Sequence, residues 1–350
     1  MYRVLQQAYS EAESGECNMK ATANEKVVYI LGAGFSAQFG LPVMSNFLEK
    51  SKDMYAIKDS RNFNGNKIDF FGDVYQEIDK LRRCKDFYAS DMTNIEEILS
   101  LFEMGKMLGV ESKQQIDFQN FIAEVIKYHT PSEFDDSEID FAPLQKFIKN
   151  LFRVGSITGY GNTHYNSELP FYAILTFNYD MLLENALSNY RQKKSENYSA
   201  QFIEEKNFSN GKLPYIKLHG AVSDPQTIVT PTWKKAFGDN EASNWKNAGD
   251  ILSEANHIRI IGYSLPITDS YLKYFLKWGA AHEQNLKSID VICLDDEQHS
   301  VENRYREFIH NKLNFYNKST SDYLDAVHDG IEDAHQNLFQ KSQSPRVQFF

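Results

Sequence analysis

The stretch VVYIL (residues 27–31), which runs directly into GAGFS (32–36), decides the fold of this chain. A continuous apolar run of this kind is typical of a strand that is buried on both faces of a parallel sheet. The Gly-x-Gly turn after it predicts a strand-to-helix connection whose backbone N–H groups can hold a pyrophosphate. The next glycine, Gly40, stands six residues after Gly34. Because the dinucleotide fingerprint G-x-G-x-x-G places that glycine closer, a purely structural turn remains an alternative.

Four further strands are expected downstream, and helical patterns alternate with them. Alternation of strands with helices implies right-handed crossovers and a mainly parallel sheet. The sequence therefore predicts an α/β, Rossmann-like, doubly wound fold. The expected strands are FYAILTF (171–177), IKLHG (216–220), IRIIGYS (258–264) and IDVICLD (289–295), and the expected helices cover 179–190, 244–256, 269–280 and 300–312.

A helical insertion is expected between the first strand and the second. Apolar residues recur at helical spacing from Ile95 to Phe102 and from Phe118 to Val125, whereas 56–72 and 131–140 have the composition of surface loops. We therefore divide the chain into four parts. These are an N-terminal arm (1–26), a Rossmann-like domain (27–48 and 171–315), a helical insertion (49–170), and a C-terminal helix and tail (316–350).

The charge balance argues against nucleic-acid and membrane partners. The chain has 48 acidic and 37 basic residues, a formal net charge of −11, and such a surface repels DNA phosphates and anionic lipid. The uncharged stretch 27–48 has the length of a membrane span, but glycines and polar residues interrupt it. We therefore expect no direct nucleic-acid contact and no membrane association.

The cysteines indicate a reducing compartment. Cys17, Cys84 and Cys293 lie far apart and form no CxxC pair, which predicts neither a disulfide framework nor a cysteine-based zinc site. The first residues also lack the apolar core of a secretory signal. A cytoplasmic location is therefore expected.

Polar residues stand at the ends of the other predicted strands. TFNYD (176–180), KLHG (217–220) and GYS (262–264) end three of them, and Asp295 closes the last. The carboxyl ends of parallel strands meet at one edge of the sheet, where doubly wound folds bind their ligands. These residues are therefore candidates for one common site.

Each motif also has an ordinary structural interpretation. Asn178 would cap a helix, and Asp180 would add a favourable charge to the first turn of that helix. A lone histidine such as His219 at a strand end is more often structural than catalytic. The occurrence of all the motifs in one chain, at one predicted edge, favours a functional site.

Taken together, the motifs resemble the Sir2 family, and more closely its prokaryotic Sir2-like branch than the protein deacetylases. The resemblance covers about half of the chain. GAGFSAQFGLP (32–42) is similar to the family's GAGxSxxxGxP, TFNYD to its TxNxD, KLHG to its catalytic His-Gly, and IIGYSLP (260–266) to its late glycine-serine segment.

The resemblance implies cleavage of the bond between nicotinamide and ribose in NAD⁺, which is the substrate. It implies that Asn178 orients the nicotinamide ribose or the attacking water, that Asp180 accepts from the nicotinamide carboxamide, and that His219 is the base. For Asp295, a solvent-facing loop carboxylate is the alternative to a contact with the adenosine ribose. The residues implied to contact the dinucleotide are Gly32, Ala33, Gly34, Phe35, Ser36, Gly262, Tyr263, Ser264 and Asp295.

Two departures from the deacetylases decide the expected reaction. Those enzymes carry an acidic-Phe-Arg stretch after GxP and a four-cysteine zinc ribbon after His-Gly. This chain has Val43-Met44-Ser45-Asn46 in the first place and no cysteine within 221–257 in the second. We therefore expect no zinc or other metal, and water as the simplest acceptor of the ribosyl group.

The expected activity is that of an NAD⁺ glycohydrolase (an NADase) that releases nicotinamide and ADP-ribose. In this branch the activity is associated with antiphage defence by depletion of NAD⁺. The resemblance further implies a homo-oligomer and a regulatory partner such as an ATPase of the same defence system. Two alternatives stay open: a protein deacylase or ADP-ribosyltransferase, and a module that binds NAD or ADP-ribose without turnover.

Overall fold

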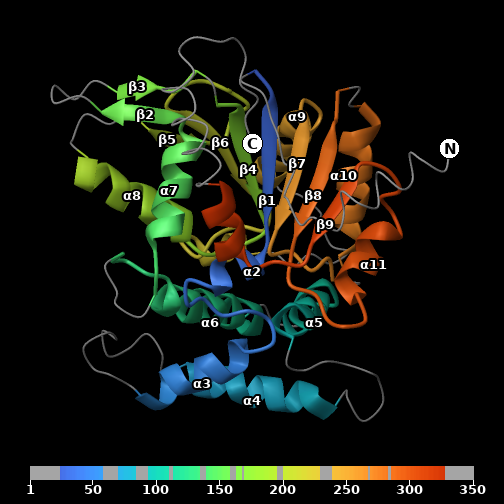
Figure 1. The fold of residues 1–350 in the computed structure, drawn as a ribbon. Helices are drawn as coiled ribbons and strands as arrows, with labels where there is room; N and C mark the ends of the chain where they lie inside the picture. Colours follow the sequence, from blue (N-terminus) through green and yellow to red (C-terminus); the bar gives the residue numbers. More distant parts are fainter. Residues whose placement is uncertain are drawn as a thin grey trace, which may run out of the picture.

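The structure is a computed structural model that describes residues 24–57, 70–83, 94–109, 113–134, 139–157, 163–167, 169–194, 200–228, 239–266, 269–282 and 285–327. A seven-stranded sheet lies at its centre (Figure 1). Every neighbouring pair of strands is parallel, in the order β5-β6-β4-β1-β7-β8-β9. The predicted α/β fold with a parallel sheet is therefore confirmed. The strands are β1 (Lys26–Leu31), β4 (Phe171–Thr176), β5 (Gln201–Ile203), β6 (Lys212–Lys217), β7 (His257–Ile261), β8 (Ser288–Ile292) and β9 (Leu313–Tyr316).

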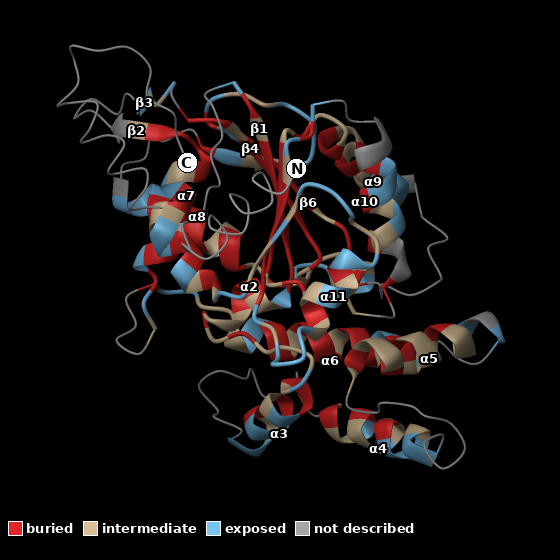
Figure 2. Ribbon diagram, turned by 45° about the vertical axis from the view of Figure 1, so that its right-hand side comes forward, coloured by how far each residue is buried: buried red, intermediate tan, exposed pale blue. Residues whose placement is uncertain are grey.

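Helices cover both faces of the sheet, and this explains the unbroken apolar run of β1. Val27 and Tyr29 pack into one buried cluster with helices α7 (Ala142–Leu151) and α8 (Leu182–Lys194). Val28 and Ile30 pack into a second cluster, with α9 (Asp239–Leu252), α10 (Ser270–His282) and α11 (Ser300–Arg306). The central strands, β1, β4, β7 and β8, are accordingly buried along most of their length (Figure 2). Burial on both faces requires apolar side chains at every position, which is what VVYIL supplies.

The chain reverses its direction of winding at β1. From β1 it continues to β4 on one side, and from β6 it returns through α9 to β7 on the other side. The crevice at the carboxyl end of β1, between two connections that run in opposite directions, is where open α/β sheets bind ligands. The short helix α2 (Ala33–Ala37) starts directly at this end.

Four helices of the expected insertion lie beyond this carboxyl edge, below α2 in Figure 1. They are α3 (Phe47–Ile57), α4 (Phe71–Leu81), α5 (Ile95–Met107) and α6 (Lys113–His129). The same stretch of chain also contains an antiparallel pair, β2 (Val154–Ile157) with β3 (Thr163–Tyr165), and helix α7, which packs on β4. The helical interpretation did not include the β2–β3 pair. The boundaries of the four parts stay a prediction, because the insertion and one face of the sheet share a single buried cluster.

Several predicted elements differ in extent from those observed. The strand expected at 216–220 ends at Lys217, and the helix expected at 300–312 ends at Arg306. Edge strands β5 and β9 were not predicted. A C-terminal helix is present from 320 to 327, the last described residues. Most of the N-terminal arm, Cys17, Cys84, and the chain after 327 lie outside the described residues.

Within the described ranges, none of the helices has both the length and the hydropathy that spanning a bilayer requires.

Candidate functional site

A cavity of about 510 Å³ opens at the carboxyl edge of the sheet, at the point where the winding reverses. Segments that follow β1, β4, β6, β7 and β8 line it, together with the loop before α3 and the start of α5. Its volume lies within the range typical of small-molecule and cofactor sites. The predicted residues that line it are Ala33, Gly34, Ser36, Asn178, Asp180, His219, Gly262, Tyr263 and Ser264.

The turns after β1 and β7 meet through two glycines. The Gly34 N–H donates to the Gly262 carbonyl at 2.8 Å. A Cβ atom on Gly34 would lie 2.9 Å from the Gly262 Cα, and one on Gly262 would lie 2.1 Å from the Phe35 nitrogen. Gly262 also has a φ of 63°, in the left-handed region that favours glycine. The absence of side chains on these glycines therefore lets the two turns approach each other. The hydrogen bond between them uses the Gly34 N–H, which belongs to the turn that was predicted to hold a pyrophosphate.

Asn178 joins the segment after β4 to the turn after β1. Its Nδ2 donates to the Gly32 carbonyl at 2.9 Å and to the Ser36 Oγ at 3.1 Å. Its backbone N–H donates to the Thr176 Oγ1 at 3.1 Å. Both side-chain bonds use Nδ2 and not Oδ1, so the amide is held in one orientation at the cavity wall.

Asp180, not Asn178, caps the helix that follows. Helix α8 begins at Leu182, and the Asp180 Oδ1 accepts from the Leu182 N–H at 3.0 Å. The Lys217 ammonium donates to the Asp180 carbonyl and forms an ion pair with Glu184 at 3.2 Å. Hydrogen bonds to its side chain and to its carbonyl therefore fix Asp180, which lines the cavity.

His219 comes two residues after the end of β6 and is buried. Its ring packs on Phe177 with a centroid separation of 4.8 Å and lies 6.5 Å from the ring of Trp245. Gly220 has a φ of 85°, and a Cβ atom there would lie 2.0 Å from the Thr227 carbonyl oxygen. The glycine of the His-Gly pair is therefore required by a tight turn that presents the imidazole at the cavity.

The segment after β7 contributes a buried tyrosine and an exposed serine. The Tyr263 hydroxyl donates to the Asp269 carboxylate, and the Tyr263 ring lies 5.2 Å from the ring of Phe177. Burial, together with the charge of Asp269, raises the pKa of Tyr263 well above its ordinary value. The Ser264 carbonyl accepts from the Arg304 Nε at 3.0 Å. Tyr263 is thus a neutral wall of the cavity rather than a proton carrier at neutral pH.

The sequence analysis missed Glu96, which lines the same cavity from the first turn of α5. The Asn94 Oδ1 caps this helix by accepting from the N–H groups of Glu96 at 2.9 Å and Glu97 at 3.2 Å. Burial, with the negative charge of Asp269, raises the pKa of the Glu96 carboxyl to about 7. In the sequence, Asn94 followed by two glutamates has the pattern of an ordinary helix start, which does not reveal a cavity behind it.

Other unpredicted lining comes from the loop before α3. Val43, Met44 and Ser45 reach the cavity, and this loop is closed by a hydrogen bond of 2.9 Å from the Val43 N–H to the Asn46 Oδ1. Loop residues without regular periodicity gave no sequence signal for a site.

Two residues of the first turn do not line the cavity. The Phe35 ring is buried, with centroids 6.1 Å from that of Phe39 and 6.0 Å from that of Phe147. Gly32 packs against Tyr263, where a Cβ atom would lie 2.6 Å from the tyrosine side chain. Their role in the site is therefore to support the turn, and contact of either residue with a dinucleotide stays a prediction.

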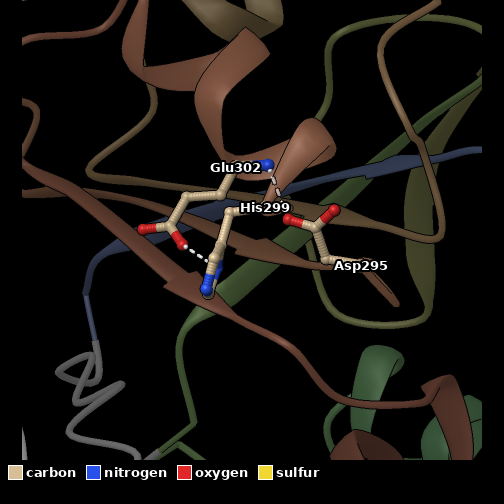
Figure 3. Close-up of side chains that lie close together, drawn as sticks. All are labelled: Asp295, His299 and Glu302. Atoms are coloured by element: carbon tan, nitrogen blue, oxygen red, sulfur yellow. Dashed lines mark hydrogen bonds and ion pairs between the residues drawn. The ribbon is translucent and has the colours of Figure 1, made fainter. Parts of the chain in front are cut away.

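Asp295 lies outside the cavity lining and caps α11 (Figure 3). Its Oδ1 accepts from the Val301 N–H at 2.8 Å and its Oδ2 from the Glu302 N–H at 2.9 Å. Burial alone would raise the pKa of this carboxyl, but the backbone donors outweigh it and the pKa is lowered. The structure does not bring Asp295 together with the other predicted site residues.

Asp295, His299 and Glu302 are also the group of three potential metal ligands found among the described residues. The His299 Nδ1 pairs with a Glu302 carboxylate oxygen at 3.2 Å, while Asp295 is committed to backbone N–H groups (Figure 3). These contacts hold the three side chains at the start of α11, and the expectation of no metal stays a prediction.

Residues 172–316, from β4 to β9, match the family model described as a SIR2-like domain. The matched segment holds Asn178, Asp180, His219 and Gly262. A solved structure of Sir2 with the inhibitor EX-527, 2′-O-acetyl-ADP-ribose and a deacetylated p53 peptide aligns over 87% of this chain and 92% of that chain, with 13% identity and a TM-score of 0.32. No curated protein matches the chain.

Proposed function

We propose that the protein is an NAD⁺ glycohydrolase, which hydrolyses NAD⁺ to nicotinamide and ADP-ribose. The observation that carries this proposal is the convergence of Asn178, Asp180 and His219 on one cavity, beside the paired turns of Gly34 and Gly262. The SIR2-like match of residues 172–316 supports an activity that uses NAD⁺.

Cleavage of NAD⁺ does not require a general acid to protonate the leaving group. When the bond between the ribose C1′ and the nicotinamide N1 breaks, its electron pair neutralises the pyridinium ring, and nicotinamide leaves uncharged. The ribosyl group becomes oxocarbenium-like and takes the oxygen of water, whose proton must leave. The enzyme therefore has to stabilise positive charge, position the water and accept a proton.

The three residues have distinct roles in this proposal. Asn178 orients the ribose or the water through the side-chain oxygen that its two Nδ2 hydrogen bonds do not use. His219 accepts the proton, a task that suits an imidazole near neutral pH. Asp180 accepts a hydrogen bond from the nicotinamide carboxamide with the carboxyl that lines the cavity.

Water is proposed as the acceptor because the parts that serve a peptide substrate in the deacetylases are absent from the sequence. Val43-Met44-Ser45-Asn46 lacks their arginine, and 221–257 lacks their zinc-binding cysteines. We further propose that the enzyme acts in antiphage defence by depleting NAD⁺, as a homo-oligomer that a partner such as an ATPase regulates. An enzyme that consumes NAD⁺ without restraint would kill its own host, so such control is required.

The test is incubation of the purified chain with NAD⁺, with and without an acetyl-lysine peptide, followed by chromatography of the products. Nicotinamide and ADP-ribose in equal amounts in both tubes support the glycohydrolase. Nicotinamide release that depends on the peptide would support a deacylase instead. Binding of NAD⁺ without any product, by a chain that is monomeric on gel filtration, would favour a binding module.

A further inference from the structure

The cavity carries more negative than positive charge. Glu96 and Asp180 line it, and Asp269 lies behind Tyr263, to whose hydroxyl it is bonded. Among the described residues that line the cavity there is no lysine and no arginine, so His219 is its basic side chain. A ligand that binds in this cavity should therefore carry a positive charge on the side that faces Glu96 and Asp180.

The three carboxyls differ in their hydrogen bonds. Asp180 accepts from the Leu182 N–H, and Asp269 accepts from the Tyr263 hydroxyl and from the Leu272 N–H at 3.0 Å. The hydrogen bonds of Glu96 to described residues involve its main chain: its N–H donates to Asn94, and its carbonyl accepts from Ser100. Of the two acidic residues that line the cavity, Glu96 is thus the one whose carboxyl accepts no hydrogen bond from another described residue.

The ionised form of Glu96 is energetically unfavourable in the cavity, and a bound cation would stabilise it. Burial penalises the ionised form, and the charge of Asp269 penalises it further, so the pKa of Glu96 rises to about 7. The other titratable residues that line the cavity are Tyr179, Asp180, His219, Tyr263 and Cys293, and Glu103 is close enough to Tyr179 to affect its pKa. The tyrosines are held neutral by raised pKa values, so a bound cation is the natural partner of the ionised Glu96.

We propose that Glu96 is a specificity-determining residue of this site, whose carboxylate selects the cationic nicotinamide ring of NAD⁺ over the neutral ring of NADH. The inference rests on the proposed function, because it takes the dinucleotide as the ligand. The two forms differ by one positive charge on the ring, and a desolvated carboxylate distinguishes them strongly. The same charge moves to the ribosyl group as the bond breaks, so Glu96 favours the oxidised substrate both on binding and during cleavage.

The test is a comparison of dissociation constants by titration calorimetry. The probes are carba-NAD⁺, which keeps the pyridinium charge but has no cleavable glycosidic bond, and NADH. The proteins are the wild type, Glu96→Gln and the matched control Glu97→Gln. Glu97 occupies the same helical turn and shares the Asn94 cap, but it does not line the cavity.

At pH 8 we expect the wild type to prefer carba-NAD⁺ by about tenfold or more, which corresponds to one good charge interaction. Glu96→Gln should lose that preference through weaker binding of carba-NAD⁺, with the affinity for NADH unchanged. Glu97→Gln should behave as the wild type. The affinity of the wild type for carba-NAD⁺ should rise about five- to tenfold from pH 6 to pH 8, because the ionised fraction of Glu96 rises about tenfold, and it should stay flat in Glu96→Gln.

Equal affinity of the wild type for the two probes, or a preference that survives in Glu96→Gln, would overturn the role of Glu96. If such a protein still hydrolyses NAD⁺, the proposed function stands without this residue. If the preference depends on Glu96 but the protein releases no nicotinamide from NAD⁺, the role of Glu96 in selectivity is supported and the proposed glycohydrolase function is wrong. Binding of neither probe overturns both. Glu96→Asp keeps the negative charge and should therefore retain part of the preference for carba-NAD⁺. If Glu96 had only a structural role, the preference would not depend on whether the replacement is charged.

Discussion

The Asn178 Nδ2 donates to the Ser36 Oγ at 3.1 Å, although 142 positions separate the two residues in the chain. With the second bond of Nδ2 to the Gly32 carbonyl, it ties the end of β4 to the turn after β1. The two motifs on which the functional interpretation rests are therefore parts of one hydrogen-bonded unit. Changes in either motif should affect the geometry of the other.

Replacement of Asn178 by alanine should abolish NAD⁺ cleavage and lower the free energy of unfolding by about 1–2 kcal/mol, because two side-chain hydrogen bonds are lost. The measurements are nicotinamide release and urea unfolding. Asn185→Ala is the matched control: its Nδ2 also donates to a backbone carbonyl, that of Pro131 at 2.8 Å, but outside the cavity. Turnover close to the wild-type rate in Asn178→Ala would refute its assignment.

Replacement of His219 by alanine should abolish turnover and leave binding of carba-NAD⁺ within about threefold of the wild type, because the proposed proton acceptor is lost but the rest of the wall remains. Some stability is lost as well, since the ring packs on Phe177. His310→Ala, at an exposed position, is the control. Near-normal cleavage by His219→Ala would show that another group accepts the proton.

Replacement of Gly34 by valine should destabilise the paired turns and thereby abolish dinucleotide binding. A side chain at Gly34 would also enter the turn that the sequence analysis assigns to a pyrophosphate. In the structure, the first carbon of the new side chain would meet the Gly262 backbone at 2.9 Å, so protein contacts alone account for the effect. Thermal unfolding and calorimetry measure the two consequences. Gly72→Ala, whose Cβ would find only an ordinary contact of 3.6 Å with Tyr55, should change neither.

The contribution of Glu96 to the stability of the wild type should fall as the pH rises from about 5 to 8. The pKa of Glu96 is raised from 4.5 to about 7 on folding, so the folded state holds this proton more tightly than the unfolded state. Its contribution is therefore fully present below the unfolded pKa and is lost as the pH rises through the folded pKa. Burial lowers the pKa values of His129 and His257, which titrate with the opposite sign in every variant, so the informative quantity is the difference between two proteins. Urea unfolding at several pH values should show that the stability of the wild type falls relative to that of Glu96→Gln as the pH rises, and stays constant relative to that of Glu97→Gln. An equal pH dependence of stability in all three proteins would contradict the raised pKa of Glu96.

The sheet could be predicted because its central strands are buried on both faces, which leaves an unbroken apolar run such as VVYIL. The edge strand β9 was missed because its residues are partly exposed and carry no such run. The motif residues that line the cavity could be predicted because carboxyl ends of parallel strands share one edge.

The rest of the site depends on tertiary contacts that no local pattern encodes. Glu96 has the signature of an acidic first turn, and only the position of α5 across the sheet edge brings it to the cavity. Asp295 shows the opposite case. It follows a strand, as a ligand-binding residue would, but its carboxylate accepts hydrogen bonds from the N–H groups of Val301 and Glu302 in α11.

The most direct measurement is the yield of nicotinamide and ADP-ribose from NAD⁺ incubated with the purified chain alone, beside His219→Ala. The account predicts equal amounts of the two products from the wild type, without any peptide, and none from His219→Ala. Release of nicotinamide only in the presence of an acyl peptide, or equal release by both proteins, would contradict it.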